Sequence, residues 1–224
     1  MKLRTFQTAE ELIFQCLETF RQVFPMLGKN DGVMLAGGRT PLEIYRRAAE
    51  KFSTEGNLFL SDERYVPVTD PQSNYGTIAP FFPNLGKVHT ELPIEQAAQT
   101  FHEHLNRMQS VPLGLLGLGA DGHTASLFNL KDAALRDERL AIAVKVEEAS
   151  SLFMQRQDAA ATFTSQRISV TPTLLHKVEK ILILATGADK KSMIQTLLEK
   201  PQTIPAGVAL ADHPNVEIWT DQIF

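Results

Sequence analysis

The amino-acid sequence predicts an α/β fold built on a mostly parallel sheet, and three observations support this prediction. Short apolar runs alternate along the chain with segments whose apolar residues recur at helical spacing. The runs are apolar at consecutive positions, as in strands that helices cover on both faces. The chain has 224 residues, 43% of them hydrophobic, and shows no internal repeat, so it can bury one sizeable core. We expect a single domain, residues 1–224, in which helices connect parallel strands.

The first part of the chain is predicted to hold two helices and two strands. Thr8 and Glu11 form a capping box at the start of the first helix, whose apolar residues share one face. Thr40 is predicted to cap the second helix, because a proline follows it and Glu43 completes a capping box. The expected order is helix 8–27, strand 32–35, helix 41–52 and strand 57–60.

The alternation resumes after one long loop. Residues 66–92 are rich in proline and poor in periodic apolar positions, so we expect a loop with one helical turn. Loops of this length in a compact domain are often functional. The run at 181–185 is the clearest buried strand. The expected order after the loop is helix 95–109, strand 113–118, strand 140–146, strand 181–185, helix 190–198 and strand 216–219.

Charge and cysteine content exclude several classes of protein. The 22 Lys and Arg against 26 Asp and Glu give a net charge of -4, without the basic excess that binding to nucleic acid or an anionic membrane requires. The single cysteine, Cys16, allows neither an internal disulfide nor a thiolate zinc site, which favours a reducing compartment. No apolar run has membrane-spanning length, and the N-terminal residues lack the apolar core of a signal peptide. We expect a cytoplasmic protein.

The most informative motif is LGLGADGHTASLF, which starts at Leu116. It places a glycine-rich turn with Asp121 and His123 at the carboxyl end of a buried strand. In open α/β sheets this edge is where ligands bind, because the loops there diverge and open a crevice. Asp121 and His123 in such a crevice are suited to act as an acid/base pair.

Two further strand-to-helix turns have the composition of an anion site. LAGGRTP, from Leu35, joins two glycines to a helix start, where backbone N–H groups favour phosphate and Arg39 supplies a guanidinium. TGADKK, from Thr186, repeats this pattern with Asp189 as the expected cap and two lysines that oppose the helix dipole. The alternative for both turns is an ordinary helix start with solvated cations.

Charged residues elsewhere are open to two interpretations. Asp62, Glu63 and Arg64 follow the strand at 57–60, so they face the same crevice as His123 or form a surface ion-pair cluster. Arg167 is equally ambiguous. No histidine pair has the spacing of a helical zinc site, so we expect no metal. The other histidines have no glycine-rich or strand-end setting and are expected in surface or core roles: His89, His102, His104, His176 and His213.

Together these segments resemble the 6-phosphogluconolactonase family. GADGHTASLF is specific, because related glucosamine-6-phosphate deaminases typically have isoleucine and a Phe-Asn-Glu run where this chain has Thr124 and residues 125–128. Arg39 stands where the family often has serine, and Asn129 where it usually has proline. The resemblance implies a Rossmann-like three-layer fold shared with those deaminases. The segments that carry it are LAGGRTP, SDERYVP with SNY ending at Tyr75, LGLGADGHTASLF, RISVTP from Arg167 and ILATGADKK from Ile183.

The resemblance also implies a reaction, the hydrolysis of 6-phospho-D-glucono-1,5-lactone to 6-phosphogluconate without a cofactor. His123 would be the general base that takes a proton from water, and Asp121 would shape the turn or orient the imidazole. The oxyanion would be stabilised by Arg64 or by backbone N–H groups of the Gly37, Gly38 and Gly119 turns. The remaining expected substrate contacts are Arg39, Thr40, Arg167 and Lys190 at the phosphate end, and Asp62, Glu63 and Asn74 at the sugar hydroxyls.

Two rival functions remain open from sequence. One is a sugar-phosphate isomerase or deaminase of the same fold, against which the DGHTASLF continuation argues. The other is a non-catalytic sugar-phosphate sensor, against which the intact His123 and the lack of a spare DNA-binding segment argue. The expected partner is a small phosphorylated sugar lactone, and a monomer is favoured.

Overall fold

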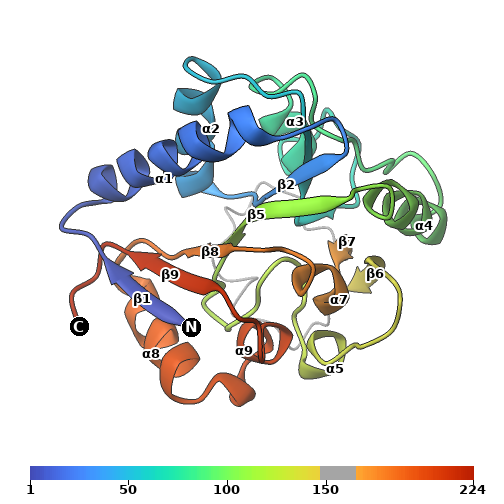
Figure 1. Cartoon of the computed structure of the whole chain (residues 1–224). Helices are drawn as coiled ribbons and strands as arrows, with labels where there is room; N and C mark the ends of the chain where they lie inside the picture. Colours follow the sequence, from blue (N-terminus) through green and yellow to red (C-terminus); the bar gives the residue numbers. More distant parts are fainter. Residues whose placement is uncertain (147–164) are drawn as a thin grey trace.

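A parallel sheet forms the centre of the computed structural model, which describes residues 1–146 and 165–224 (Figure 1). Within these residues its six strands follow the order β1-β9-β8-β5-β2-β3, and every neighbouring pair is parallel. The mostly parallel sheet predicted from the sequence is therefore confirmed. The strands are β1 (Lys2–Thr5), β2 (Asp31–Leu35), β3 (Asn57–Leu60), β5 (Ser110–Gly117), β8 (Ile181–Leu184) and β9 (Val216–Thr220).

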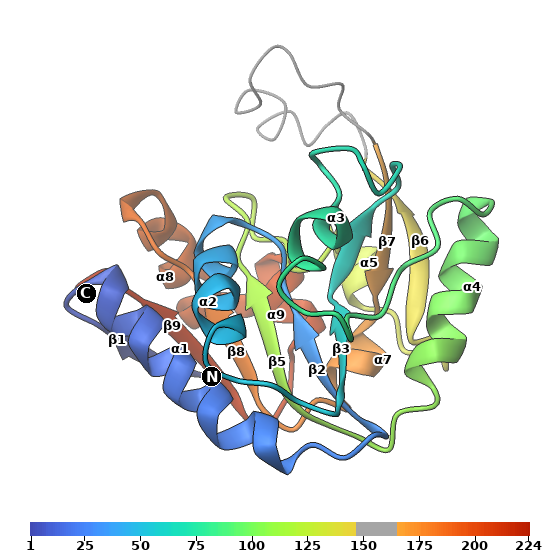
Figure 2. The ribbon, with the colours of Figure 1, turned by 90° about the horizontal axis from the view of Figure 1, so that it is seen from above.

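A second, antiparallel sheet lies beside the first, beyond β3 (Figure 2). It contains β4 (Asp62–Arg64), β7 (Gln166–Val170) and β6 (Ala141–Lys145), in the order β4-β7-β6. The sequence predicted β6 but neither β4 nor β7, and it also missed β1. β4 is three residues long and β1 is largely exposed, so neither has the continuous apolar run that marks a buried strand.

Helices cover both faces of the parallel sheet. In Figure 1, α1 and α2 lie on one face, and α8 and α9 lie on the other. This arrangement confirms the Rossmann-like three-layer architecture. The described helices are α1 (Ala9–Val23), α2 (Arg39–Ala49), α3 (Asn74–Ile78), α4 (Ile94–Leu105), α5 (Leu130–Ala133), α7 (Pro172–Leu175), α8 (Lys191–Glu199) and α9 (Pro205–Ala209), with single 3-10 turns at Phe24–Met26, Ala188–Lys190 and Pro201–Thr203.

The core has two parts, one on each side of the parallel sheet, because successive strand residues point to opposite faces. Leu113 and Leu115 of β5 pack with the α1 and α2 residues, whereas Leu116 packs with the other side. Tyr45 of α2 is fully buried, and its hydroxyl donates to the Ala36 carbonyl at 2.9 Å and accepts from the Ala36 N–H at 3.0 Å. This pair of bonds fixes the end of β2, where the first glycine turn begins.

The long loop and the first helix agree closely with the prediction. α3 is a short helix inside residues 66–92, and the Ser73 hydroxyl caps it by accepting from the Gly76 N–H at 2.9 Å. The Thr8 hydroxyl caps α1 by accepting from the Glu11 N–H at 3.2 Å. Both caps satisfy a backbone donor that the helix itself leaves unpaired.

The predicted caps of α2 and α8 were wrong. α2 begins at Arg39, and its cap is Gly38 with φ 107°, a left-handed conformation that glycine adopts without strain. The Thr40 hydroxyl instead lies 2.7 Å from that of Thr186. Asp189 lies inside the 3-10 turn that precedes α8, and that turn is preceded by Gly187 with φ 97°.

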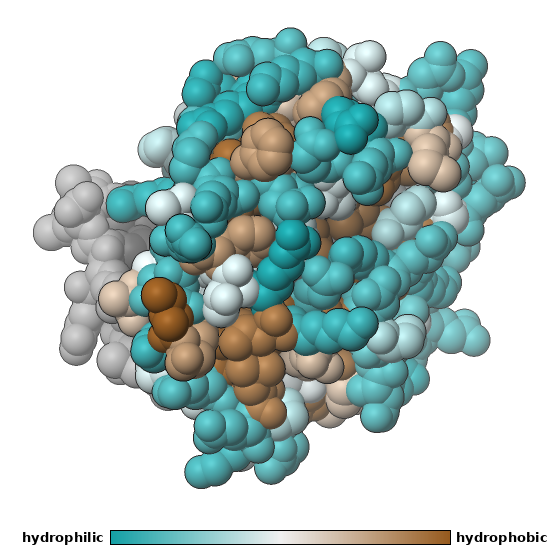
Figure 3. Space-filling model, turned by 60° about the vertical axis from the view of Figure 1, so that its left-hand side comes forward, coloured by the Kyte–Doolittle hydropathy of each residue, from teal (hydrophilic) through white to brown (hydrophobic). Residues whose placement is uncertain are grey.

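No helix among the described residues is long and apolar enough to cross a membrane. Large apolar side chains that remain exposed include Phe14, Ile223 and Phe224. On the face shown in Figure 3, hydrophilic residues predominate and the apolar atoms form small groups between them.

Candidate active site

A cavity of about 390 Å³ opens at the carboxyl edge of the parallel sheet, where the loops after β2, β3 and β5 meet. Figure 2 shows β5, β2 and β3 side by side. Because these strands are parallel, the loops that follow them leave the sheet at one edge. This is the crevice that the strand order of an α/β sheet predicts as a ligand site. Its lining comprises Ala36, Gly37, Gly38, Ser61, Asp62, Arg64, Asn74, Gly117, Leu118, Gly119, Ala120, Asp121, His123, Ala125 and Lys190.

His123 and Asp121 form a hydrogen-bonded pair in the turn after β5. The His123 Nδ1 bonds an oxygen of the Asp121 carboxylate, which also accepts from the His123 backbone N–H at 3.2 Å. A carboxylate only accepts, so the proton of this bond lies on Nδ1 and the lone pair of the neutral ring lies on Nε2. The side chains are 16% and 23% exposed, respectively, so the pair is shielded but reachable from the cavity.

Gly119 makes room for this pair. A Cβ at this position would lie 2.1 Å from the His123 Nδ1 and 2.5 Å from an Asp121 carboxylate oxygen. The Gly119 N–H donates to the His123 carbonyl at 2.9 Å, which closes the turn. The glycine is therefore required by the side-chain pair that lies over it.

The surroundings of the pair hold its charge and orientation. Burial raises the pKa of Asp121, but the hydrogen bonds and charge of His123 outweigh it and bring that pKa below its ordinary value. The Phe128 ring lies 4.5 Å from the imidazole, centroid to centroid. The Gly122 carbonyl accepts from the Ala206 N–H at 2.8 Å, which ties the turn to α9.

Asp62, Arg64 and Asn74 bring further polar groups to the lining of the cavity. An Arg64 guanidinium nitrogen donates to the Gln72 carbonyl at 2.8 Å. The Asn74 amide donates to the Asp62 carbonyl at 2.8 Å, and its other end lies against Gly37, where a Cβ would come within 2.2 Å of Oδ1. The loop after β2 is thereby packed directly on α3.

Glu63 points away from the cavity. It is 1% exposed, and its two carboxylate oxygens accept four hydrogen bonds, from the backbone N–H groups of Arg64, Asn74 and Tyr75 and from the Ser73 hydroxyl. Burial raises the pKa of Glu63, against the effect of the three N–H groups. These contacts hold α3 in place, and Glu63 is not among the residues that line the cavity.

Lys190 reaches the cavity, whereas the other predicted phosphate cations lie outside its described lining. Arg39 is exposed, and Arg167 is 2% exposed between β4 and β6. Burial and the nearby charge of Arg64 lower the pKa of Arg167 to about 10. Lys191, next to Lys190, turns to the C-terminus and donates to the Ile223 carbonyl.

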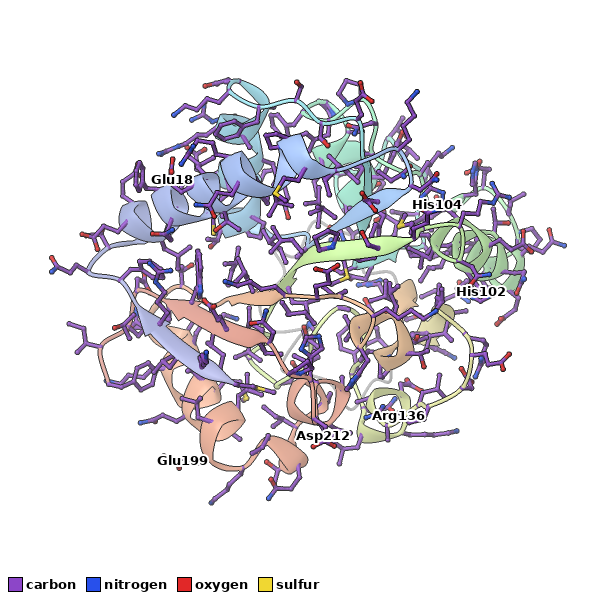
Figure 4. All side chains as sticks on the ribbon, viewed as in Figure 1. Glu18, His102, His104, Arg136, Glu199 and Asp212 are labelled. Carbon is purple, nitrogen blue, oxygen red and sulfur yellow. The ribbon has the colours of Figure 1, made fainter. Side chains whose placement is uncertain are left out.

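The remaining histidines do not reach the site. His102 and His104 lie on α4, at the edge of the molecule in Figure 4. His102 accepts from the Leu140 N–H at 3.1 Å, and His213 is buried against the Val178 carbonyl. Within residues 1–146 and 165–224, no group of three His, Cys, Asp or Glu side chains is placed to hold a metal ion.

Sequence reasoning gave no role to several residues at the cavity, among them Ser61 and Ala125, nor to Ser126 beside it. Ser61 and Ser126 both donate to the Asp62 carboxylate, at 2.8 and 2.7 Å. Ala125 lines the cavity in a left-handed conformation with φ 48°. Ser126 belongs to the quoted motif, but nothing local marks it, because its partner Asp62 is 64 residues away in the sequence.

The fold and the site define an α/β protein with a histidine–aspartate pair at the ligand edge of its parallel sheet. Residues 7–219 match the family described as glucosamine-6-phosphate isomerases/6-phosphogluconolactonase. The chain belongs to this family.

Relatives and solved structures agree with this assignment. The chain is 42% identical to a 6-phosphogluconolactonase of Thermotoga maritima over 192 residues, which cover 78% of this chain and 77% of the relative. It is 27% identical to the Haemophilus influenzae 6-phosphogluconolactonase over 225 residues, covering 92% and 88%. A crystal structure of 6-phosphogluconolactonase from Thermotoga maritima superposes with a TM-score of 0.78 at 26% identity, covering 97% and 96%. A monomeric glucosamine-6-phosphate deaminase shares the fold, with a TM-score of 0.82 at 20% identity, covering 99% and 98%.

Proposed function

We propose that this protein hydrolyses 6-phospho-D-glucono-1,5-lactone to 6-phosphogluconate, with His123 as general base. The observation that carries the proposal is the His123–Asp121 hydrogen bond at the wall of the cavity, which orients the imidazole and holds the ring proton on Nδ1. A lactone is an activated ester, so its hydrolysis needs an activated water, a stabilised oxyanion and groups that bind the phosphate. The names of the relatives support the same substrate.

The proposed reaction has two steps. His123 Nε2 takes a proton from water while the water oxygen bonds to C1, and the carbonyl electron pair moves to the oxygen to give a tetrahedral oxyanion. The oxyanion then re-forms the carbonyl, the bond from C1 to the ring oxygen breaks, and His123 returns the proton to that oxygen. Asp121 stabilises the imidazolium between these steps, which its lowered pKa favours.

Arg64 is the group that we assign to the oxyanion. It lines the cavity, and its guanidinium is held by the Gln72 carbonyl. A guanidinium fixed before the reaction pays no reorganisation cost as charge develops on the substrate oxygen. The sequence also suggested backbone N–H groups of the Gly119 turn, but the N–H of Gly119 donates to the His123 carbonyl and that of His123 to Asp121, so we assign the oxyanion to Arg64.

Lys190 and the start of α2 are the groups that we assign to the phosphate. Gly37 and Gly38 line the cavity, and α2 has no side-chain cap, so the helix start is suited to an anion. The hydrogen bond between the hydroxyls of Thr40 and Thr186 joins this turn to the segment that carries Lys190. Arg39 and Arg167 are left out because neither lies in the described lining.

Lys190→Ala therefore raises KM about tenfold or more and changes kcat less, because the lost contact is remote from C1. Lys191→Ala is the matched control, since its neighbouring ammonium binds the Ile223 carbonyl. Steady-state kinetics on both variants measure the difference. Equal KM values for the two variants would place the phosphate elsewhere.

We further propose that the protein acts as a monomer in the cytoplasm. All the side chains assigned to the reaction come from one chain, and its one cysteine is free and buried. Light scattering on purified protein at assay concentration measures the mass, and 24.9 kDa is the expected value. A mass twice this value would contradict the proposal that the protein is a monomer.

The function itself is tested by turnover of freshly generated 6-phosphogluconolactone. Product is coupled to 6-phosphogluconate dehydrogenase, and the spontaneous rate is subtracted. We expect catalysis well above that background. A folded protein that gives only the spontaneous rate contradicts the proposal and directs attention to deaminase, isomerase or sensor activity.

A further inference from the structure

Ser126 is buried behind the cavity wall and touches the cavity through Asp62. It is 1% exposed, and its hydroxyl donates to the Asp62 Oδ2 at 2.7 Å. The Ser61 hydroxyl donates to the other carboxylate oxygen at 2.8 Å. Ser126 follows the histidine turn, whereas Asp62 follows β3, so this bond joins the two loops that carry the proposed chemistry.

The backbone of Ser126 is held from the second sheet. Its N–H donates to the Ser169 hydroxyl oxygen at 3.1 Å, and that hydroxyl donates to the Val170 carbonyl at 2.9 Å. Ser169 and Asp62 are paired residues of β7 and β4. Ser126 thus lies over one strand pair and bonds both of its members, which leaves its hydroxyl little freedom.

The conformation of the preceding residue directs Ser126 toward this pair. Ala125 has φ 48°, a left-handed conformation that costs a residue with a Cβ about 1 kcal/mol. Ala125 itself lines the cavity. The turn brings His123 to the cavity and Ser126 to Asp62 within four residues.

Asp62 retains the capacity to bind a substrate hydroxyl. A carboxylate offers about four lone-pair directions, and the two serines use two of them. The Asp62 backbone carbonyl is held separately by the Asn74 amide at 2.8 Å. Three donors therefore fix Asp62 at the lining of the cavity, two at its carboxylate and one at its backbone carbonyl.

We infer that Ser126 is a positioning residue of the lactonase site, which aligns the Asp62 carboxylate to accept a hydroxyl of a polyhydroxylated substrate. The inference rests on the proposed function. It concerns substrate alignment and gives Ser126 no contact with the reacting atoms.

The test compares Ser126→Ala with a matched control at the opposite edge of the sheet. Ser110→Ala also removes a serine-to-aspartate hydrogen bond, the one to Asp31 at 2.6 Å, at the start of β5. We expect Ser126→Ala to lower kcat/KM about tenfold, mainly through KM, since the lost bond is to a charged group. Ser110→Ala should keep the wild-type kinetic constants. Circular dichroism and Tm establish that both variants fold.

A double-mutant cycle separates an effect on the alignment of Asp62 from an effect on the stability of the whole protein. In an Asp62→Ala background, Ser126→Ala should lower kcat/KM no further, because its partner is gone. Independent, additive losses would overturn the inference, and so would unchanged kinetics in Ser126→Ala when the wild type is active. A wild type that gives only the spontaneous rate overturns the proposed function itself, and the inference falls with it.

Discussion

At the scale of single residues, the tautomer of His123 is the feature on which the proposed chemistry depends. Asp121 fixes the proton on Nδ1, and Gly119 leaves the space in which the two side chains meet. The arrangement is local, since all three residues lie within one turn. Its chemistry was therefore accessible from the sequence.

Asp121→Asn tests the tautomer directly. The amide can donate to Nδ1, which moves the ring proton to Nε2 and removes the lone pair that the base needs. We expect kcat to fall roughly a hundredfold with a smaller change in KM. Asp137→Asn, which breaks a surface ion pair with Arg139, is the control and should leave kcat unchanged. Near-normal kcat in Asp121→Asn would remove Asp121 from the mechanism.

Other residues show why sequence reasoning stops at local patterns. Asp62, Glu63 and Arg64 are adjacent, yet the first and third line the cavity whereas Glu63 is buried under α3. Alternation along β4 turns Glu63 to the opposite face. The sequence showed the cluster but not the strand, so it could not separate the three roles. The burial of Arg167 was not foreseen either, since β7, the strand that carries it, was not predicted.

At the scale of elements, α3 depends on a single buried carboxylate. Glu63 accepts from two backbone N–H groups and one hydroxyl at the start of this five-residue helix. Without that anion the helix start would bury unpaired donors. α3 in turn supplies Asn74 to the cavity wall.

Glu63→Gln consequently destabilises the protein by about 3 kcal/mol, because the amide NH₂ faces donors where the carboxylate accepted them. Chemical denaturation monitored by circular dichroism measures the loss. Glu103→Gln on the exposed face of α4 is the control and should change the free energy of unfolding by only a few tenths of a kcal/mol. Equal stability of the two variants would show that α3 does not need the anion.

The same scale shows which elements are predictable. Strands β2, β3, β5, β8 and β9 and the four longer helices follow from apolar periodicity, because each buries a continuous face. The starts of α2 and α8 were not predictable in this way. Glycines with φ near 100° begin both helical segments, so the expected Thr40 and Asp189 caps are not used.

At the scale of the whole molecule, carboxylates in ion pairs link stability to pH. Hydrogen bonds from Arg46 and Arg47 lower the pKa of Glu43 to about 2. Hydrogen bonds with His89 and Lys87 likewise lower the pKa of Glu91 to about 2. A carboxyl whose pKa is depressed by folding stabilises the protein above its unfolded pKa and loses that effect as the pH falls through the folded value.

We therefore expect Tm to fall as the pH decreases from about 4.5 toward 2, as these groups protonate. Calorimetry across this range measures the trend. Glu91 is exposed and Glu43 is partly exposed, so 1 M salt should reduce the contribution of these ion pairs to the change in Tm. A Tm that stays constant down to pH 2 would show that the ion pairs contribute nothing.

In the proposed reaction His123 removes a proton from water during lactone hydrolysis. The most direct measurement is kcat of His123→Ala beside the wild type, with 6-phosphogluconolactone as substrate and the spontaneous rate subtracted. We expect clear turnover by the wild type and a loss of about a hundredfold or more in kcat of the variant, which should keep the wild-type circular dichroism spectrum. Near-normal kcat in the folded variant would contradict this proposal.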